Sequence, residues 1–416
     1  MNKILAVFKT QTIKDGFLMG LGTFFTALFG FLFTILMART LSPEKFGIFS
    51  ALTSLLAIIY SLGDLGVGPA IINLLPRQPN QEIKIISTSF WFQYLVGLVL
   101  AVLLWVLAGF SHSLIPGSLP GHFYLIGSLV FNYILIGWAQ SVLTAKRDFL
   151  RISLSQIIDS SLKIGLAYYL YTHSGLSISM ALAANALAVS LALFLIFSKD
   201  LIVVPLKFDK KVFQQMFHFS KWIAISRFFS VLNSKIDIIM LNLLSSSFQA
   251  GIYAAASRVT LLFAITVSSL GSVVNPRFSK FETKKDFRVY TKKLLYLISG
   301  LAVLLLITVL LADKIIILVF GQDFLQSIRV FQYLSLSMVP FLYSIIFTGA
   351  LLYTFQNSAY YAYLTFLNIF IIFVVNAIGI PQFGVMAPVF GLFLANIVCL
   401  LLGAIKVRKL YQTILK

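Results

Sequence analysis

Apolar runs of about 20 residues, the length that crosses a bilayer as a helix, dominate this 416-residue chain. Charged residues make up only 11% of it, against about 25% in soluble domains. The pattern predicts an all-α polytopic membrane protein with about twelve transmembrane helices. The expected helices cover residues 17–38, 47–70, 86–109, 122–144, 150–171, 176–197, 218–243, 251–274, 294–311, 329–353, 358–379 and 385–405.

Lysine and arginine are distributed unevenly between the connections. With a cytoplasmic N-terminus, 23 of them fall in cytoplasmic segments and four in outer segments. Because cytoplasmic loops carry an excess of Lys and Arg, we expect both termini to be cytoplasmic. The start lacks a small-residue cleavage site, so the first apolar segment is expected to remain as an anchor. The net charge of +19 then faces anionic lipid headgroups, and no nucleic-acid partner is expected.

The two halves of the chain resemble each other. "LSPEKFGIFSAL" (41–52) matches "LSSSFQAGIYAAA" (244–256), and "GLSISMALAAN" (175–185) matches "GVMAPVFGLFLAN" (384–396). Both offsets span six helices, which predicts two parallel six-helix bundles around a central cavity, with chance similarity of apolar sequence as the alternative. The expected domains are an N-terminal bundle (1–198), a cytoplasmic linker (199–215) and a C-terminal bundle (216–416).

The segment "ISRFFSVLNSKIDIIML" (225–241) carries three charges inside an apolar helix. At 100° per residue, Arg227 and Asp237 fall with four Ser and Asn residues within about 120° of the helix surface. We expect this stripe to face a cavity or another helix, because a charge facing lipid costs several kcal/mol. Arg227 is a candidate substrate contact, with a structural pair to Asp237 or to a carboxylate of another helix as the alternative. Lys235 lies near the outer end, where its stem can reach the interface.

Two more cations lie inside predicted helices. Arg258 follows small residues in "GIYAAASRV", which let a large ligand or a neighbouring helix approach closely. Lys163 follows Asp159 by four residues, the favoured spacing for an ion pair within a helix. Lys163 is therefore a candidate substrate contact only if this pair is loose, and mutual neutralisation with Asp159 is the alternative.

Asp64 lies in the glycine-rich stretch "SLGDLGVG", where the helix can break. Broken helices line substrate or ion paths in transporters, and a solvated helix-end aspartate is the alternative. The asparagines within helices are expected to bond between helices. With one cysteine, Cys399, and no histidine pair at ligand spacing, no metal site is expected. The chain also lacks a phosphate-binding glycine loop and a nucleophile with an adjacent base, so no enzyme or catalytic residue is expected.

The motifs "MARTLSPEKFGIFSAL", "LGDLGVGPAI", "KIDIIMLNLLSSSFQAGIYAAASRV", "ILVFGQDF" and "IPQFGVMAPVFG" occur in this order through most of the chain. Together they resemble the polysaccharide transporter, or Wzx-type O-antigen flippase, family of the multidrug/oligosaccharidyl-lipid/polysaccharide exporter superfamily. The resemblance implies a transporter that moves undecaprenyl-pyrophosphate-linked oligosaccharide across the bacterial or archaeal cytoplasmic membrane by alternating access. It also implies membrane lipids and glycan-assembly proteins such as a polymerase as partners.

A pyrophosphate brings about two negative charges, which suits the cations Arg227, Arg258 and Lys163. No cofactor is expected; the membrane potential, or coupled H⁺ or Na⁺, is expected to drive export, with Asp237 and Asp64 as candidate coupling residues. A drug or cation antiporter of the same superfamily is the first alternative, although its site should favour carboxylates. A membrane glycan polymerase or ligase is the second, but such enzymes resemble chains with a large basic outer loop.

Overall fold

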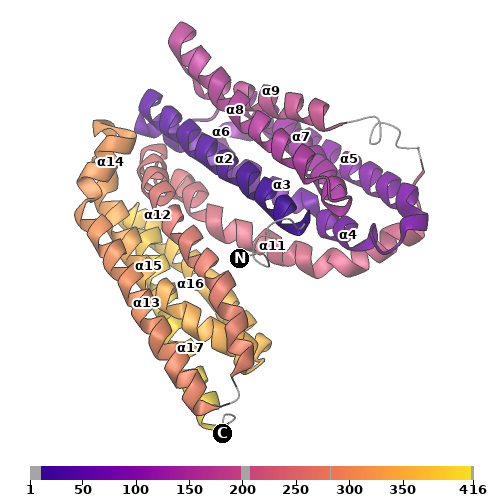
Figure 1. Cartoon of the computed structure of the whole chain (residues 1–416). Coiled ribbons are helices and arrows are strands. Elements are labelled where there is room, and N and C mark those ends of the chain that lie inside the picture. Colours follow the sequence, from indigo (N-terminus) through magenta and orange to yellow (C-terminus); the bar gives the residue numbers. More distant parts are fainter. Residues whose placement is uncertain (1–10, 198–206, 282, 414–416) are drawn as a thin grey trace. The chain divides into compact units, whose positions relative to one another are not determined.

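The computed structural model describes residues 11–197, 207–281 and 283–413, and all regular structure in these ranges is helical (Figure 1). The all-α prediction is confirmed, and each predicted segment is largely helical, although 47–70 is divided between two helices. Ten helices of the described chain are long and apolar enough to cross a membrane. The two predicted segments that fall outside this set are α8 (Phe149–Ser174) and α11 (Lys210–Leu244). Both carry charged residues in their interior, so the candidate site residues concentrate where the apolar signal is weakest.

Packing divides the chain into two compact units, Met1–Ile236 and Asp237–Lys416, with the boundary inside α11. The predicted bundles and the linker between them stay a prediction, and residues 198–206 lie outside the described part. The first unit contains α2 (Gln11–Thr40), α3 (Pro43–Asp64), α4 (Val67–Leu74), α5 (Glu82–Leu107), α6 (Ser111–Leu114), α7 (Pro120–Ala145), α8, α9 (Ile178–Ile196), most of α11, and the 3₁₀ turns η1 (Pro79–Gln81) and η2 (Ala108–Phe110).

The second unit begins at Asp237, inside α11. It contains the end of α11, α12 (Ser247–Val274), η3 (Asn275–Lys280), α13 (Lys284–Leu310), α14 (Ala312–Phe320), η4 (Gln322–Phe324), α15 (Ser327–Gly349), the π-helical turn η5 (Ala350–Thr354), α16 (Ser358–Phe383) and α17 (Met386–Thr413).

One helix forms the centre of each unit. In the first unit, α7 packs against α3, α4, α5, α8 and α9, and α2 lies beside α8. The α7 side chains Phe123, Ile126, Leu129 and Val130 are completely buried. In the second unit, α15 packs against α12, α13, α14 and α17. A central helix with this many neighbours can bury polar side chains away from lipid, which is the environment that a membrane transport site needs.

Polar caps explain where the helices begin. Ser42, followed by proline, accepts a backbone hydrogen bond at the start of α3, and Ser246 and Asn357 cap α12 and α16 in the same way. Asp209 accepts from the backbone N–H groups of Val212 and Lys211 at the start of α11.

The Asp209 cap is sensitive to acid. The N–H groups of Val212 and Lys211, together with the nearby Lys84 ammonium, hold the pKa of the Asp209 carboxyl below its usual range. Because the folded-state pKa is lowered, the cap contributes its stabilisation above the usual aspartate pKa. That contribution is lost as the pH falls through the lowered value.

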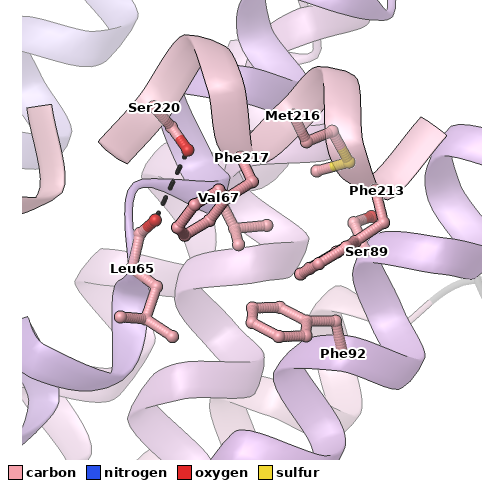
Figure 2. A pocket seen from close by; sticks show the side chains of 8 residues that line it. All are labelled: Leu65, Val67, Ser89, Phe92, Phe213, Met216, Phe217 and Ser220. Carbon is pink, nitrogen blue, oxygen red and sulfur yellow. Dashed lines mark hydrogen bonds between the residues drawn. The ribbon is translucent and has the colours of Figure 1, made fainter. Parts of the chain in front are cut away.

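The predicted helix 47–70 is interrupted. It consists of α3 and α4, because Leu65 and Gly66 adopt left-handed conformations with φ values of 44° and 73°. The first half of α11 packs against this break, where the Ser220 hydroxyl donates to the Leu65 carbonyl at 3.4 Å (Figure 2). A small apolar pocket lies beside this contact, lined by Leu65, Val67, Ser89, Phe92, Phe213, Met216, Phe217 and Ser220. The break therefore forms part of the surface on which α11 is held.

Gly66 is required at this contact for two reasons, and its replacement tests both. A Cβ at Gly66 would lie 2.7 Å from the Cβ and the carbonyl oxygen of Ser220, whereas a Cβ at Gly175 would meet nothing within 4 Å. Gly175 has ψ of 153° and Gly66 ψ of 14°, so Gly175→Ala is expected to cost about 1–3 kcal/mol for backbone strain alone. Gly66→Ala should cost about 1–2 kcal/mol for its left-handed backbone and about 1–3 kcal/mol more because α11 must move. Thermal unfolding of the purified variants in detergent measures both losses, and a Gly66→Ala loss no larger than about 2 kcal/mol would contradict the close approach.

Candidate functional site

The six residues that the sequence singles out divide between the two units. Asp64, Asp159, Lys163 and Arg227 belong to the first unit. Asp237 and Arg258 belong to the second. The structure therefore brings the four charges of the first unit together in two ion pairs. In the described part of the second unit, Asp237 and Arg258 do not pair with each other.

Arg227 pairs with Asp64. The Arg227 Nη1 donates to the Asp64 Oδ2 at 3.2 Å, between α11 and the last residue of α3. The other carboxylate oxygen accepts from the Gly68 N–H at 3.4 Å, and the Gln93 amide donates to the Asp64 carbonyl at 2.9 Å. The arginine side chain is 57% exposed and the aspartate side chain 23%. The sequence left open a pair between Arg227 and a carboxylate of another helix, and the structure shows this pair. The carboxylate is Asp64, which the sequence had marked for a different reason, the helix break.

Asp159 and Lys163 form the ion pair that their spacing predicts. The Lys163 Nζ lies 3.6 Å from the Asp159 Oδ2, and both side chains are largely buried. Lys163 also donates to the Tyr133 hydroxyl at 3.1 Å, which in turn donates to the Asn185 side-chain oxygen at 2.9 Å. The second oxygen of Asp159 is buried without a hydrogen-bond partner in the described part of the chain. The pair is therefore fixed by three helices, α7, α8 and α9.

Two tyrosines lie between these ion pairs. Tyr60 is one turn before Asp64 on α3, and its ring lies 6.1 Å from the ring of Tyr133, which holds Lys163. The two pairs of the first unit are thus connected through aromatic side chains. Sequence reasoning missed both tyrosines, since nothing distinguishes them among the 17 tyrosines of the chain.

Asp237 has neutral partners. Its carboxylate accepts from the Tyr253 hydroxyl and from the Asn376 side-chain amide, both at 2.7 Å. In the described part of the chain no cation pairs with it, so the predicted alternative of an Arg227–Asp237 pair is not the arrangement observed. The remaining side-chain oxygen of Asn376 is buried without a partner among the described residues. The carboxylate and this amide oxygen form an oxygen-rich environment inside the second unit.

Arg258 lies about three turns into α12. The preceding Ala254, Ala255 and Ala256 are buried, so the small residues let neighbouring helices approach as expected. The arginine itself is half-buried. Among the described residues, no hydrogen bond or ion pair occupies its guanidinium. An arginine in this setting can receive an anionic ligand without losing a protein partner.

The asparagines inside helices bond between helices, as predicted. Asn132 donates to Ser190, Asn368 to Asn396, and Asn396 to the Ser337 carbonyl. Their role is structural packing of polar groups in an apolar interior. Asn185 and Asn376 differ, because they bond to the charged clusters described above.

Known proteins match the chain over most of its length. The family model described as "Polysaccharide biosynthesis protein" matches residues 12–282. A putative O-antigen transporter of Shigella flexneri is 24% identical over 324 residues, which cover 74% of this chain and 76% of that protein. The succinoglycan biosynthesis transport protein ExoT of Rhizobium meliloti is 23% identical over 332 residues, which cover 75% of this chain and 63% of that protein.

Solved transporter structures share the fold. The lipid II flippase MurJ in an inward closed conformation aligns with a TM-score of 0.76 at 18% identity, covering 96% of this chain and 90% of that chain. An inward-facing multidrug resistance MATE family transporter of the MOP superfamily aligns with a TM-score of 0.72 at 14% identity, covering 94% and 95%. At these identities the similarity establishes a common fold.

The buried ion pair on α8 provides a stability test. Lys163→Met should destabilise the protein by about 3–5 kcal/mol, because it leaves the Asp159 charge buried without compensation. Adding Asp159→Asn should recover most of that loss, since both charges are then removed. Lys84→Met is the matched control: its lysine is also 3.6 Å from an aspartate, but it is 61% exposed, and the loss should stay below about 1 kcal/mol. Thermal unfolding in detergent measures all three, and equal losses for the two lysines would contradict the buried pair.

Proposed function

Because the chain belongs to the polysaccharide biosynthesis protein family, we propose that it is a flippase that moves a lipid-linked oligosaccharide across the cytoplasmic membrane by alternating access. The substrate that fits best is an oligosaccharide on undecaprenyl pyrophosphate. The names of the relatives in Shigella and Rhizobium, an O-antigen transporter and a succinoglycan transport protein, support transport of a glycan rather than its synthesis. The chain is accordingly proposed to be a secondary transporter and not an enzyme.

The observation that carries this proposal is the unpaired guanidinium of Arg258 in a membrane helix. A cation at this depth costs several kcal/mol without an anion beside it, and the described protein supplies none. A pyrophosphate, with about two negative charges and several acceptor oxygens, would compensate it, because arginine binds phosphate oxygens with two parallel hydrogen bonds. Arg227, held by one contact among the described residues, is the further proposed substrate contact. Lys163 is not proposed as one, because its ion pair with Asp159 is buried and fixed by Tyr133.

The membrane potential supplies a driving force. With the cell interior negative, moving two negative charges outward is favoured by about 4–5 kcal/mol per 100 mV if they cross the full field. Asp237 is the proposed site for a coupled H⁺ or Na⁺, because its carboxylate has neutral hydrogen-bond partners and an unpaired amide oxygen beside it. Hard cations are bound by oxygen ligands of this kind.

The proposed location is the bacterial or archaeal cytoplasmic membrane, with both termini in the cytoplasm. The lysine and arginine distribution supports this orientation. In this orientation, a glycan polymerase or another glycan-assembly protein at the outer face is the expected recipient of the product.

A cation or drug antiporter is the second candidate. Asp237 is the observation that favours it, since a carboxylate without a cationic partner could receive a cationic drug. Export of ethidium-like cations from cells, with no effect on surface glycan, would select this candidate over the flippase. The proposed flippase is favoured by the family and by the interior arginines Arg227 and Arg258.

Charge reversal of the arginines tests the flippase. Arg227→Glu and Arg258→Glu should each abolish surface glycan export while the protein still inserts and accumulates, because a carboxylate repels the pyrophosphate. Arg329→Glu is the control, since this arginine is exposed at the start of α15. Native mass spectrometry should find a pyrophosphate-linked lipid with the unmodified protein and not with the Arg258 variant. Normal export by both variants would remove the cationic-site argument.

Substitution of Asp237 tests the coupling. In vesicles, flipping of a fluorescent lipid pyrophosphate by the unmodified protein should respond to an imposed H⁺ or Na⁺ gradient. Asp237→Asn should abolish that response, because the neutral amide cannot exchange a cation. Tyr253→Phe removes one hydrogen-bond donor and keeps the carboxylate, so it should keep the response. A response that survives in Asp237→Asn assigns coupling elsewhere.

A further inference from the structure

We propose that Asp64 is an internal competitor for the anion-binding guanidinium of Arg227, and that it thereby sets which anions the transporter accepts. In the substrate-free protein its carboxylate occupies Arg227. An anion binds there only if it gains more from the guanidinium than one carboxylate does. This inference rests on the proposed function and assigns a selectivity role to a residue that does not itself need to touch the substrate.

The contact between the two residues is weak enough to be exchanged. One nitrogen of the guanidinium meets one oxygen of the carboxylate at 3.2 Å, although arginine and aspartate can form two parallel hydrogen bonds. The Arg227 side chain is 57% exposed. No other hydrogen bond involves its guanidinium among the described residues. An incoming anion can therefore reach arginine nitrogens that the aspartate leaves unused.

The two partners differ in how firmly they are held. Asp64 ends α3 directly before the left-handed residues Leu65 and Gly66, and Gln93 fixes its backbone carbonyl. Its second carboxylate oxygen keeps the Gly68 N–H when Arg227 leaves. Arg227 is joined to α11 by a long flexible side chain. The exchange thus requires rotation of one arginine side chain, while the aspartate stays in place and retains a donor.

A carboxylate attached to the protein favours those anions that carry more charge and can form more hydrogen bonds with Arg227 than it does. Because Asp64 is part of the protein, it is present beside Arg227 at a high effective concentration, and a free monoanion with similar chemistry gains nothing by replacing it. A pyrophosphate gains a second hydrogen bond and a second charge. Asp64 should therefore exclude chloride, acetate and the single carboxylates of acidic sugars, and admit the pyrophosphate group of a lipid carrier.

The test measures binding of inorganic pyrophosphate to the purified full-length protein by calorimetry. If the pair is mostly formed, removing the competitor should lower the Kd: Asp64→Asn is expected to bind pyrophosphate about three- to tenfold more tightly. Acetate should also begin to compete in this variant. Asp64→Glu, which keeps a carboxylate, should behave as the unmodified protein, and adding Arg227→Gln to Asp64→Asn should remove the gain.

Glu82→Gln is the matched control. It also removes a carboxylate from an ion pair with a cation, Lys146 at 2.8 Å, on other helices of the same unit. Its pyrophosphate affinity should not change. Asp64→Ser provides a second competitor-free variant if the asparagine variant does not accumulate.

The outcomes separate this inference from the proposed function. Unchanged or weaker pyrophosphate binding by folded Asp64→Asn or Asp64→Ser, when the unmodified protein does bind pyrophosphate, overturns the competitor role alone and leaves Asp64 a structural partner. Absence of pyrophosphate binding by the unmodified protein overturns the proposed function and this inference together. Tighter binding with reduced discrimination against acetate, lost again when Arg227→Gln is added, supports the role, because weaker repulsion alone would leave the gain in place without Arg227.

Discussion

The cost of a charge in a low-dielectric environment determines most of what is specific in this structure. A cation or carboxylate within a membrane helix costs several kcal/mol unless a partner offsets it. The chain meets this requirement to different degrees. Asp159 and Lys163 compensate each other on one helix, and Asp64 and Arg227 make a single contact between two helices. Asp237 has only neutral donors. The degree of compensation, rather than the presence of charge, distinguishes structural groups from candidate ligand contacts.

The helical framework explains why these groups lie where they do. In the first unit, α7 is the central helix, and it carries Tyr133 into contact with Lys163 of α8 and Asn185 of α9. The break between α3 and α4 turns the chain at Asp64, so that its carboxylate lies at the end of a helix and not along its side. The same break receives the first half of α11, through Ser220, and so brings Arg227 alongside. A single backbone feature thus positions both members of one ion pair.

Local features of the sequence were sufficient to predict much of this. Apolar runs located the twelve long helices of the described residues, and the four-residue spacing identified the Asp159–Lys163 pair. The glycines around Asp64 indicated a break, but the left-handed Leu65 has no signal, since leucine rarely adopts this conformation. The start of α13 at Lys284 was missed by ten residues, because its charged first turns do not register as apolar. The Arg227–Asp64 pair joins residues 163 positions apart, and a single sequence cannot specify a contact at that distance.

The second unit carries the clearest argument that these charges serve a ligand. Tyr253, which donates to Asp237, is only five residues before Arg258 on α12. An arginine in the same unit as a buried carboxylate would be expected to neutralise it if stability were the only requirement, and apolar residues at both positions would be at least as stable. Yet no ion pair joins them among the described residues. A protein that keeps a carboxylate and a guanidinium apart in one unit bears two desolvation costs at once. This arrangement supports the proposal of an anionic substrate coupled to a cation, with an anion for the arginine and a cation for the aspartate.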